Sequence, residues 1–180
     1  LRMLLFAVLS EVPFDLMYGG TVFYPVHQNV IWTLLLGLLG IRLMEAARAK
    51  GKRWLYVLTC AAVVVLGFAL GTLGMVDYYG AGVLTVFAFY FFRERKWWCL
   101  LGQLAALYWL NVVVLGGQMY PVTVFGREIE LCEQGLALLA LVPIWLYRGR
   151  QGHHSKAFQY ACYAFYPAHM LVLALLTMIQ

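Results

Sequence analysis

Residues 3–15 read MLLFAVLSEVPFD, an apolar run that ends in two carboxylates and a proline. A helix that spans a membrane needs ~20 mostly apolar residues, and an ionisable side chain inside such a helix is usually functional. Pro13 cannot donate a helical hydrogen bond and crowds the carbonyl four residues back, which leaves that carbonyl free. The stretch therefore has two interpretations. It is a span that stops at Ser10 with Glu11 and Asp15 in the interface, or a kinked, polar-lined span that faces a cavity.

The whole chain shares this apolar character. Its 180 residues are 64% hydrophobic and 12% charged, and the mean hydropathy is +0.80, whereas soluble domains average roughly 45–50% apolar and ~25% charged residues. This composition indicates an integral membrane protein and leaves no room for a separate soluble domain. We predict an all-α, polytopic helix bundle that forms a single transmembrane domain over residues 1–180. The four cysteines show no CxxC spacing and predict neither a disulfide framework nor a metal site.

The apolar segments predict about seven spans. Basic residues collect in cytoplasmic loops, and the segments between spans at 42–53, 93–96 and 148–156 hold nearly all the Lys and Arg of the chain. We therefore place these loops and Leu1 in the cytoplasm, and we attribute the net charge of +5 to topology rather than to nucleic-acid binding. The predicted spans are 1–17, 26–44, 54–76, 80–92, 97–115, 129–147 and 157–179.

Two ionisable residues fall deep inside predicted spans. At a helical rise of 1.5 Å per residue, Glu11 lies roughly 14 Å and His169 roughly 16 Å into a ~30 Å hydrocarbon core. A neutral imidazole beside a carboxylate is a candidate general base, so we predict that the two residues act together. The structural alternative is that His169 only hydrogen-bonds the backbone near Pro167. Tyr166 adds a further polar group to this span.

A second polar group gathers at the outer interface. His27, Gln28 and Asn29 open the second predicted span, and Asp77 and Tyr79 lie in the turn before the fourth. Amide and imidazole groups can bind a substrate or steady an oxyanion, but the same residues can simply cap a helix or form a turn. We treat all of them as candidate substrate-binding residues.

The basic loops also have two interpretations. Arginine presents a planar fork of donors that matches phosphate oxygens, so the cytoplasmic cations can hold the phosphates of a cytosolic cofactor. They can equally be topology signals alone. The candidates for cofactor binding are Arg93, Arg95, Lys96, Arg148 and Arg150.

Four segments resemble the TraX family of bacterial inner-membrane proteins, which is named for the conjugal pilin acetylase. They are LLFAVLSEVPFDL (4–16), HQNVIWTLLLGLL (27–39), DYYGAGVL (77–84) and FYPAH (165–169). The resemblance covers nearly the whole chain, and it matches the family's motif positions at Glu11, Gln28, Asn29, Asp77, Tyr78 and His169.

The resemblance implies a multi-pass acyltransferase of the bacterial inner (cytoplasmic) membrane. Such an enzyme moves an acetyl group from acetyl-CoA to an amine or hydroxyl acceptor, which is a pilin-like peptide or another envelope molecule, in contact with membrane lipid and without a metal. Members of the family usually carry about two further spans before the position of Leu1, and the first contains an Asp-His pair. We therefore expect this chain to be the C-terminal part of a longer protein. The alternative from a different class is a small membrane transporter or a non-catalytic scaffold.

Overall fold

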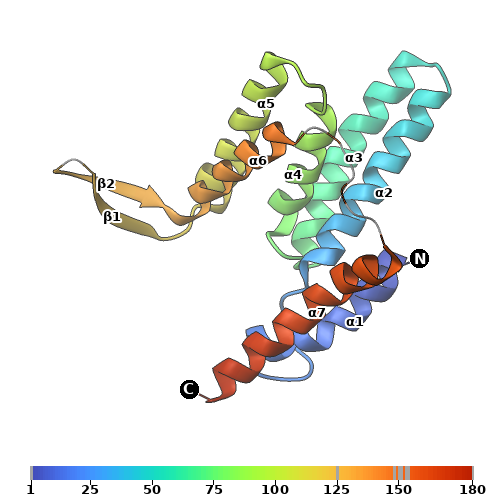
Figure 1. The fold of residues 1–180 in the computed structure, drawn as a ribbon. Coiled ribbons are helices and arrows are strands. Elements are labelled where there is room, and N and C mark those ends of the chain that lie inside the picture. Colours follow the sequence, from blue (N-terminus) through green and yellow to red (C-terminus); the bar gives the residue numbers. More distant parts are fainter. Residues whose placement is uncertain (1, 125, 148, 150–151, 153–154, 180) are drawn as a thin grey trace. The chain divides into compact units, whose positions relative to one another are not determined.

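The computed structural model of the chain is mainly helical, as the sequence predicts. It describes residues 2–124, 126–147, 149, 152 and 155–179 (Figure 1). The elements are α1 (Arg2–Gly19), α2 (Val30–Ala49), α3 (Arg53–Leu73), α4 (Tyr79–Phe91), α5 (Trp97–Tyr108), the π-helical η1 (Trp109–Leu115), β1 (Met119–Val124), β2 (Arg127–Cys132), the 3-10 helix η2 (Glu133–Ala140), α6 (Leu141–Leu146) and α7 (Lys156–Ile179).

Four helices in the described part of the chain are long and apolar enough to cross a membrane. They are α2, α3, α5 continued by η1, and α7. α4 and the combined η2–α6 segment are shorter, and α1 carries three charged residues, Arg2, Glu11 and Asp15. The structure therefore supports the all-α membrane fold, while the count of seven spans stays a prediction.

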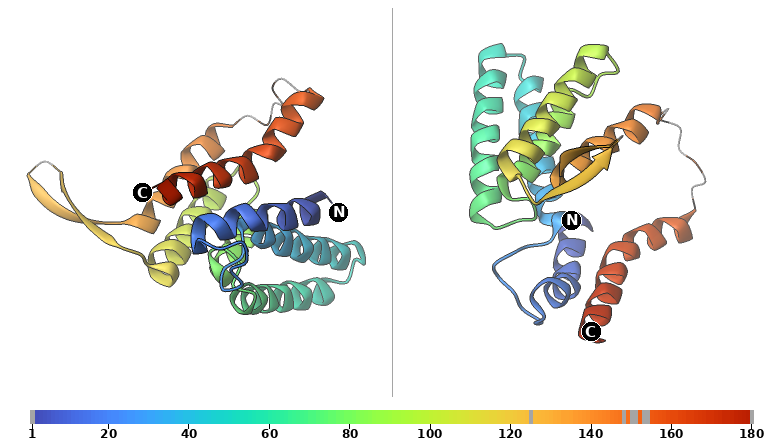
Figure 2. Two further views of the ribbon diagram at one scale, coloured as in Figure 1. Left: turned by 90° about the horizontal axis from the view of Figure 1, so that it is seen from below. Right: turned by 90° about the vertical axis from the view of Figure 1, so that its left-hand side faces the viewer.

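The chain divides into two compact units, which are described separately: Leu1–Val83 with Gln151–Gln180, and Leu84–Arg150. In the first unit α2 and α3 run side by side, as both views of Figure 2 show. The buried residues of α2 recur every three or four positions and so form one stripe on the helix. Small side chains in this stripe let two helices approach closely. The stripe consists of Thr33, Gly37, Gly40, Met44 and Ala47.

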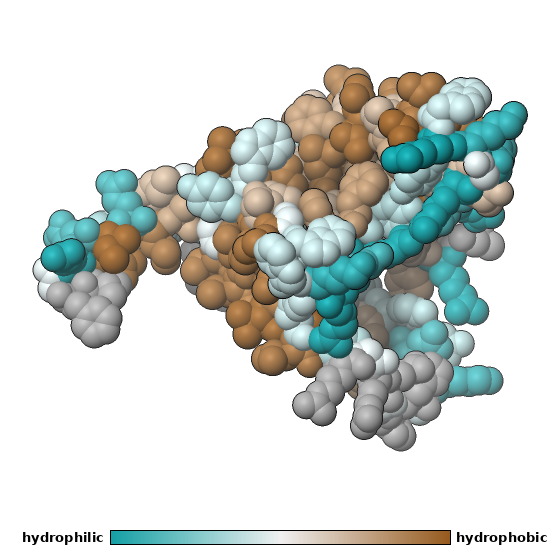
Figure 3. All heavy atoms as spheres, turned by 90° about the horizontal axis from the view of Figure 1, so that it is seen from above, coloured by the Kyte–Doolittle hydropathy of each residue, from teal (hydrophilic) through white to brown (hydrophobic). Residues whose placement is uncertain are grey.

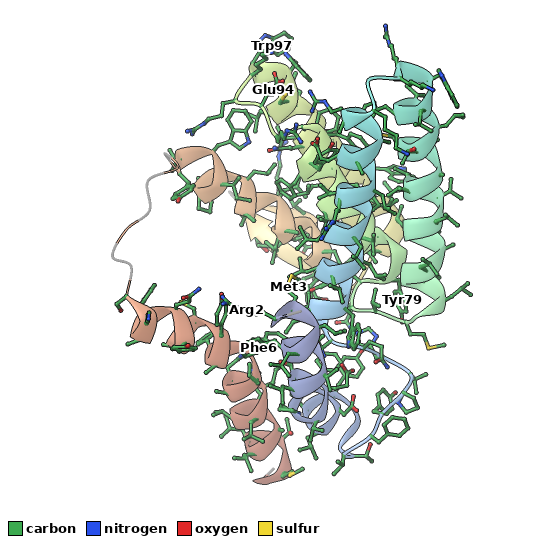
Figure 4. All side chains as sticks on the ribbon, turned by 90° about the vertical axis from the view of Figure 1, so that its right-hand side faces the viewer. Arg2, Met3, Phe6, Tyr79, Glu94 and Trp97 are labelled. Carbon is green, nitrogen blue, oxygen red and sulfur yellow. The ribbon has the colours of Figure 1, made fainter. Side chains whose placement is uncertain are left out.

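α1 packs lengthwise against α7 in the same unit. Figure 4 labels Phe6 on α1, and its ring lies 5.2 Å from that of Tyr163 on α7, measured between centroids. α1 continues through Pro13 to Gly19. The missing hydrogen bond at one proline does not end this packed helix, so Glu11 and Asp15 both lie within α1. Where the membrane span ends along α1, at Ser10 or beyond, stays a prediction.

The second unit contains the largest departure from the sequence prediction. Residues 116–128 were predicted to be a loop and 129–147 a helical span, but Met119–Val124 and Arg127–Cys132 form an antiparallel hairpin. The reason is a period of two in β2, where Ile129 and Leu131 alternate with polar neighbours, which suits a strand and not a helix. α-Helix is reached only at Leu141–Leu146.

Exposed apolar side chains cover much of the helices in both units. Figure 3 shows a largely hydrophobic face with long hydrophilic side chains at one edge. At the α2–α3 turn, Arg48, Lys50, Lys52 and Arg53 are exposed. A surface of this kind is typical of a protein whose helices contact lipid and whose basic loops contact water.

Candidate functional site

α1 carries its polar side chains on the face that is buried in the first unit. Ala7 and Ser10 are fully buried, and Phe14 and Asp15 are nearly so. Glu11 lies one helical turn after Ala7 and one turn before Asp15, and residues four apart share a helix face. The helix therefore directs two carboxylates and a hydroxyl into the protein.

Asn29 joins this face to the beginning of α2. Its side chain is fully buried, and its Oδ1 accepts a hydrogen bond from the Ile31 N–H at 3.0 Å, as expected of an asparagine that caps a helix. Its Nδ2 donates to the Ala7 carbonyl at 2.9 Å and to Oε2 of Glu11. One amide thus satisfies the helix terminus and binds α1 twice.

Trp32 supplies a second donor to the same carboxylate oxygen. Its Nε1–H donates to Glu11 Oε2 at 2.7 Å. The other oxygen, Glu11 Oε1, is buried and has no hydrogen-bond partner among the described residues. The carboxylate is therefore held firmly on one side and keeps one oxygen for a further donor.

His27 and Asp77 form a second polar pair in this unit. Nε2 of His27, which is 7% exposed, lies 3.3 Å from Oδ1 of Asp77. The imidazole ring stacks on Tyr18 with centroids 4.6 Å apart and on Phe14 at 5.6 Å, and it meets Tyr79 edge-on at 5.8 Å. These aromatic rings cover the imidazole, while the Asp77 side chain stays 25% exposed.

Burial raises the pKa of the Asp77 carboxyl above its ordinary value, and the hydrogen bond from His27 opposes this only in part. The backbone around Asp77 is also tied to α2 and to the segment before it. Thr33 Oγ1 donates to the Asp77 carbonyl at 2.7 Å, and the Gln28 N–H donates to the Met75 carbonyl at 2.9 Å. These contacts fix the position of the carboxylate relative to the imidazole.

The turn that carries Asp77 has an unusual backbone. Met75, Tyr78 and Tyr79 have φ angles of 50°, 59° and 50°, in the left-handed region that bulky residues rarely adopt. Figure 4 labels Tyr79, the first residue of α4, which follows this turn. Such strain persists only where surrounding contacts impose it, and it often marks functional sites.

Further buried oxygens near this cluster lack donors. Asp15 Oδ2 accepts from the Tyr24 N–H at 3.0 Å, but Asp15 Oδ1, Ser10 Oγ and the Tyr166 hydroxyl have no hydrogen-bond partner among the described residues. Buried polar atoms are nearly always paired in proteins. The first unit thus holds unmet hydrogen-bonding capacity on α1 and α7.

α7 contributes Tyr166 and His169. The Tyr166 ring meets the His169 ring edge-on, with the centroids 5.3 Å apart. Nδ1 of His169 lies 3.0 Å from the Phe165 carbonyl, to which it donates. In the neutral ring this leaves Nε2 as the acceptor.

The structure thus brings Glu11 and Asn29 into direct contact and pairs His27 with Asp77. Helical rise alone put Glu11 halfway across the membrane, but its bonds place it level with the first turn of α2. No described hydrogen bond joins Glu11 to His169, and Tyr166 makes a ring contact with His169. The Gln28 amide donates to the Pro25 carbonyl at 3.3 Å, away from the carboxylate.

The basic candidates lie in the second unit, where a pocket of about 360 Å³ is lined by Arg93, Arg95, Trp145 and other residues. Arg95 donates to the Trp145 carbonyl, and Arg93 lies over the Tyr90 ring at 4.7 Å. Lys96 pairs with Glu94, which raises the pKa of the lysine. Arg148 and Arg150 lie outside the described residues.

Two residues of the site were not predicted from the sequence. Trp32 and Thr33 looked like ordinary residues of an apolar helix, yet they donate to Glu11 and to the Asp77 carbonyl. The available signal was their spacing, because residues three and four positions after Asn29 share its side of α2.

Among the described residues, no group of three or more His, Cys, Asp or Glu side chains is arranged to hold a metal ion. Comparison with protein families matches residues 1–177 to the family described as TraX protein. Comparison with curated proteins and with solved structures gives no match.

Proposed function

Because this chain belongs to the TraX family, we propose that it is a membrane acyltransferase that moves an acetyl group from acetyl-CoA to an amine or hydroxyl acceptor. The acceptor is a pilin-like peptide or another molecule of the bacterial envelope, and the enzyme resides in the inner membrane.

The observation that carries the proposal is the environment of Glu11. Placing a carboxylate in an apolar membrane helix costs free energy, and such a residue is usually functional. Here Asn29 and Trp32 hold one oxygen, and the other is buried without a partner. A carboxylate that only stabilised the fold would be expected to have both oxygens satisfied.

Acyl transfer requires a base for the acceptor and donors for the oxyanion. We assign His169 as the base, since its bond to the Phe165 carbonyl leaves Nε2 to accept a proton. Glu11 orients the acceptor or the base through Oε1. Both N–H groups of the Asn29 amide are committed to Ala7 and Glu11, so Asn29 positions the carboxylate. We assign Gln28, which keeps one amide N–H beyond its bond to Pro25, as the oxyanion donor. His27, Asp77, Tyr79 and Tyr166 line the acceptor site.

Acetyl-CoA would be held by the basic pocket of the second unit. Arg93 and Arg95 offer guanidinium donors for phosphate oxygens, and Trp145 offers an aromatic surface. Lys96 lies next to this pocket in the sequence, and its charge is offset by the ion pair with Glu94. Replacing Arg93 or Arg95 with glutamine should raise the KM for acetyl-CoA several-fold and leave kcat nearly unchanged, because both residues bind the donor and not the reacting atoms.

The decisive experiment uses the natural full-length protein in liposomes with acetyl-CoA. It measures the release of free CoA thiol. It also measures the incorporation of radiolabelled acetyl groups into lipid and protein fractions prepared from the cell envelope of the source bacterium. Glu11→Gln and His169→Ala should each lower the transfer rate by roughly 10²-fold or more, the range expected when a positioned acid–base group is lost.

Glu45→Gln is the matched control, since Glu45 forms a partly exposed ion pair with Arg48 at 3.7 Å on the surface of α2. Its rate should equal that of the unaltered protein. A protein that inserts and folds but releases no CoA with any envelope fraction would contradict the enzymatic proposal and favour a transporter or scaffold.

A further inference from the structure

The β1–β2 hairpin has two chemically different faces. Its register pairs Tyr120 with Leu131 and Val122 with Ile129, and residues directly opposite one another point to the same side of a sheet. These four side chains therefore lie on one face, which is apolar along its length and carries Arg127 at the turn end. Their exposed fractions run from 39% for Val122 to 50% for Ile129, so the face is not covered by the rest of the protein.

The opposite face is polar. The alternate pairs of the same register are Pro121 with Glu130 and Thr123 with Glu128, whose four residues are exposed, and Met119 with Cys132 at the base of the hairpin. Beyond its base, the hairpin therefore carries two carboxylates on one face and four apolar side chains on the other.

The base of the hairpin is fixed to the end of a candidate span. η1 ends at Leu115, and β1 begins four residues later. The Glu133 N–H donates to the Gln118 carbonyl at 3.0 Å, and Cys132 Sγ donates to the Gly116 carbonyl at 3.1 Å. The hairpin therefore starts where this candidate span ends, at the opposite end of α5–η1 from the basic loop that precedes it.

We propose that this hairpin lies flat in the membrane interface, with its apolar face against lipid and Glu128 and Glu130 toward water. A two-stranded sheet is marginally stable alone, so covering one face would stabilise it. The described sheet has only two strands, and each keeps one edge without a ladder partner. Open edges do not occur inside the hydrocarbon core, which limits the hairpin to the polar boundary.

Lipid fits this face better than a protein partner does. A standard protein interface buries about 800 Å² on each side, which is far more than four partly exposed side chains provide. Tyr120 is also typical of interfacial positions, where its ring contacts acyl chains and its hydroxyl contacts water; here the hydroxyl donates to the Gln118 side chain at 2.8 Å.

The test compares neighbours on one strand. Val122→Cys and Thr123→Cys are made separately in the full-length protein with its native cysteines replaced, and each is spin-labelled in liposomes. Oxygen concentrates in lipid and a nickel chelate stays in water, so the collision rates with both report the surroundings of each label. Ile129→Cys and Glu128→Cys repeat the comparison on the partner strand.

We expect labels at 122 and 129 to meet more oxygen than nickel, and labels at 123 and 128 to show the reverse. High nickel access at all four positions would overturn the proposal, since the apolar face would then be in water. Low access to both reagents at 122 and 129 would also overturn it and indicate a protein partner; relief by dilution of the protein in lipid would identify that partner as a second copy. High oxygen access at all four positions would overturn it as well, since the face with Glu128 and Glu130 would then lie in lipid.

Discussion

Replacing Asn29 with alanine should be among the most destabilising single changes in the chain. The substitution removes the cap of α2, worth about 1 kcal/mol, and a neutral hydrogen bond to the Ala7 carbonyl, also worth about 1 kcal/mol. It further removes a bond to the Glu11 carboxylate, and bonds to charged groups contribute about 2 kcal/mol.

The bonds lie in a membrane protein, where side-chain hydrogen bonds average about 0.6 kcal/mol. We therefore expect Asn29→Ala to lose about 2 kcal/mol of unfolding free energy on that scale and about 4 kcal/mol on the scale of soluble proteins. The measurement is unfolding in bicelles by steric trapping, which reports a free energy under native conditions.

Gln28→Ala is the matched control. Gln28 precedes Asn29 and carries a similar amide, but its side chain makes only a 3.3 Å bond to the Pro25 carbonyl at the surface. Alanine also retains the backbone bond from residue 28 to Met75. The expected loss is about 0.5 kcal/mol or less, as for most surface changes. Equal losses for the two variants would refute the assignment of Asn29 as the link between α1 and α2.

A charge-based variant separates the cap from the contact with Glu11. Asn29→Asp keeps a good capping oxygen but places a carboxylate against Glu11, so it should be at least as destabilising as Asn29→Ala. Adding Glu11→Gln restores a donor to the pair and should recover stability. No recovery would mean that the carboxylate is not where the destabilisation arises.

Three further outcomes are expected. Thr33→Val, which keeps the shape but removes the bond to the Asp77 carbonyl, should cost about 1 kcal/mol in the same unfolding assay, and no loss would contradict the bond. Burial raises the pKa of Asp77 above its ordinary value of 3.8, so this group stabilises the fold below pH 3.8, and the stabilisation is lost as the pH rises through the folded-state pKa. Asp77→Asn should remove this pH dependence of the unfolding free energy and leave the protein no less stable at neutral pH. An unchanged pH profile would show that Asp77 is not the source of the pH dependence. Cysteines placed at Gln118 should react with an impermeant reagent from outside intact cells, and those at Gly149 should not, with the reverse pattern contradicting the orientation.

The fold was predictable where one signal dominated. The predicted spans 26–44, 54–76 and 157–179 agree with α2, α3 and α7 to within five residues at every end. Basic residues marked the turn between α2 and α3. The hairpin was missed because a membrane context favoured reading Ile129 and Leu131 as part of a span, although their alternation with Glu128 and Glu130 has the period of a strand.

The sequence identified most residues of the site but not how they are arranged. Motif residues near Asn29 and Asp77 were identified from the sequence, but helical rise from the chain start put Glu11 at a different depth from Asn29. Depth along one helix says nothing of how that helix is shifted against its neighbours. Trp32 is the clearest example. In the sequence it is one apolar residue among many, whereas in the structure its indole N–H donates to Glu11.

The pairing of α1 with α7 has a consequence for biogenesis. These are the first and last helices of the described chain, yet they pack together and hold Glu11 and Tyr166 in one unit. During synthesis α1 reaches the membrane long before α7 leaves the ribosome, so its carboxylates Glu11 and Asp15 wait without one of their packing partners. Membrane chaperones and proteases meet that intermediate first, and a chain that stalls before residue 156 should be recognised and degraded as an orphaned polar helix.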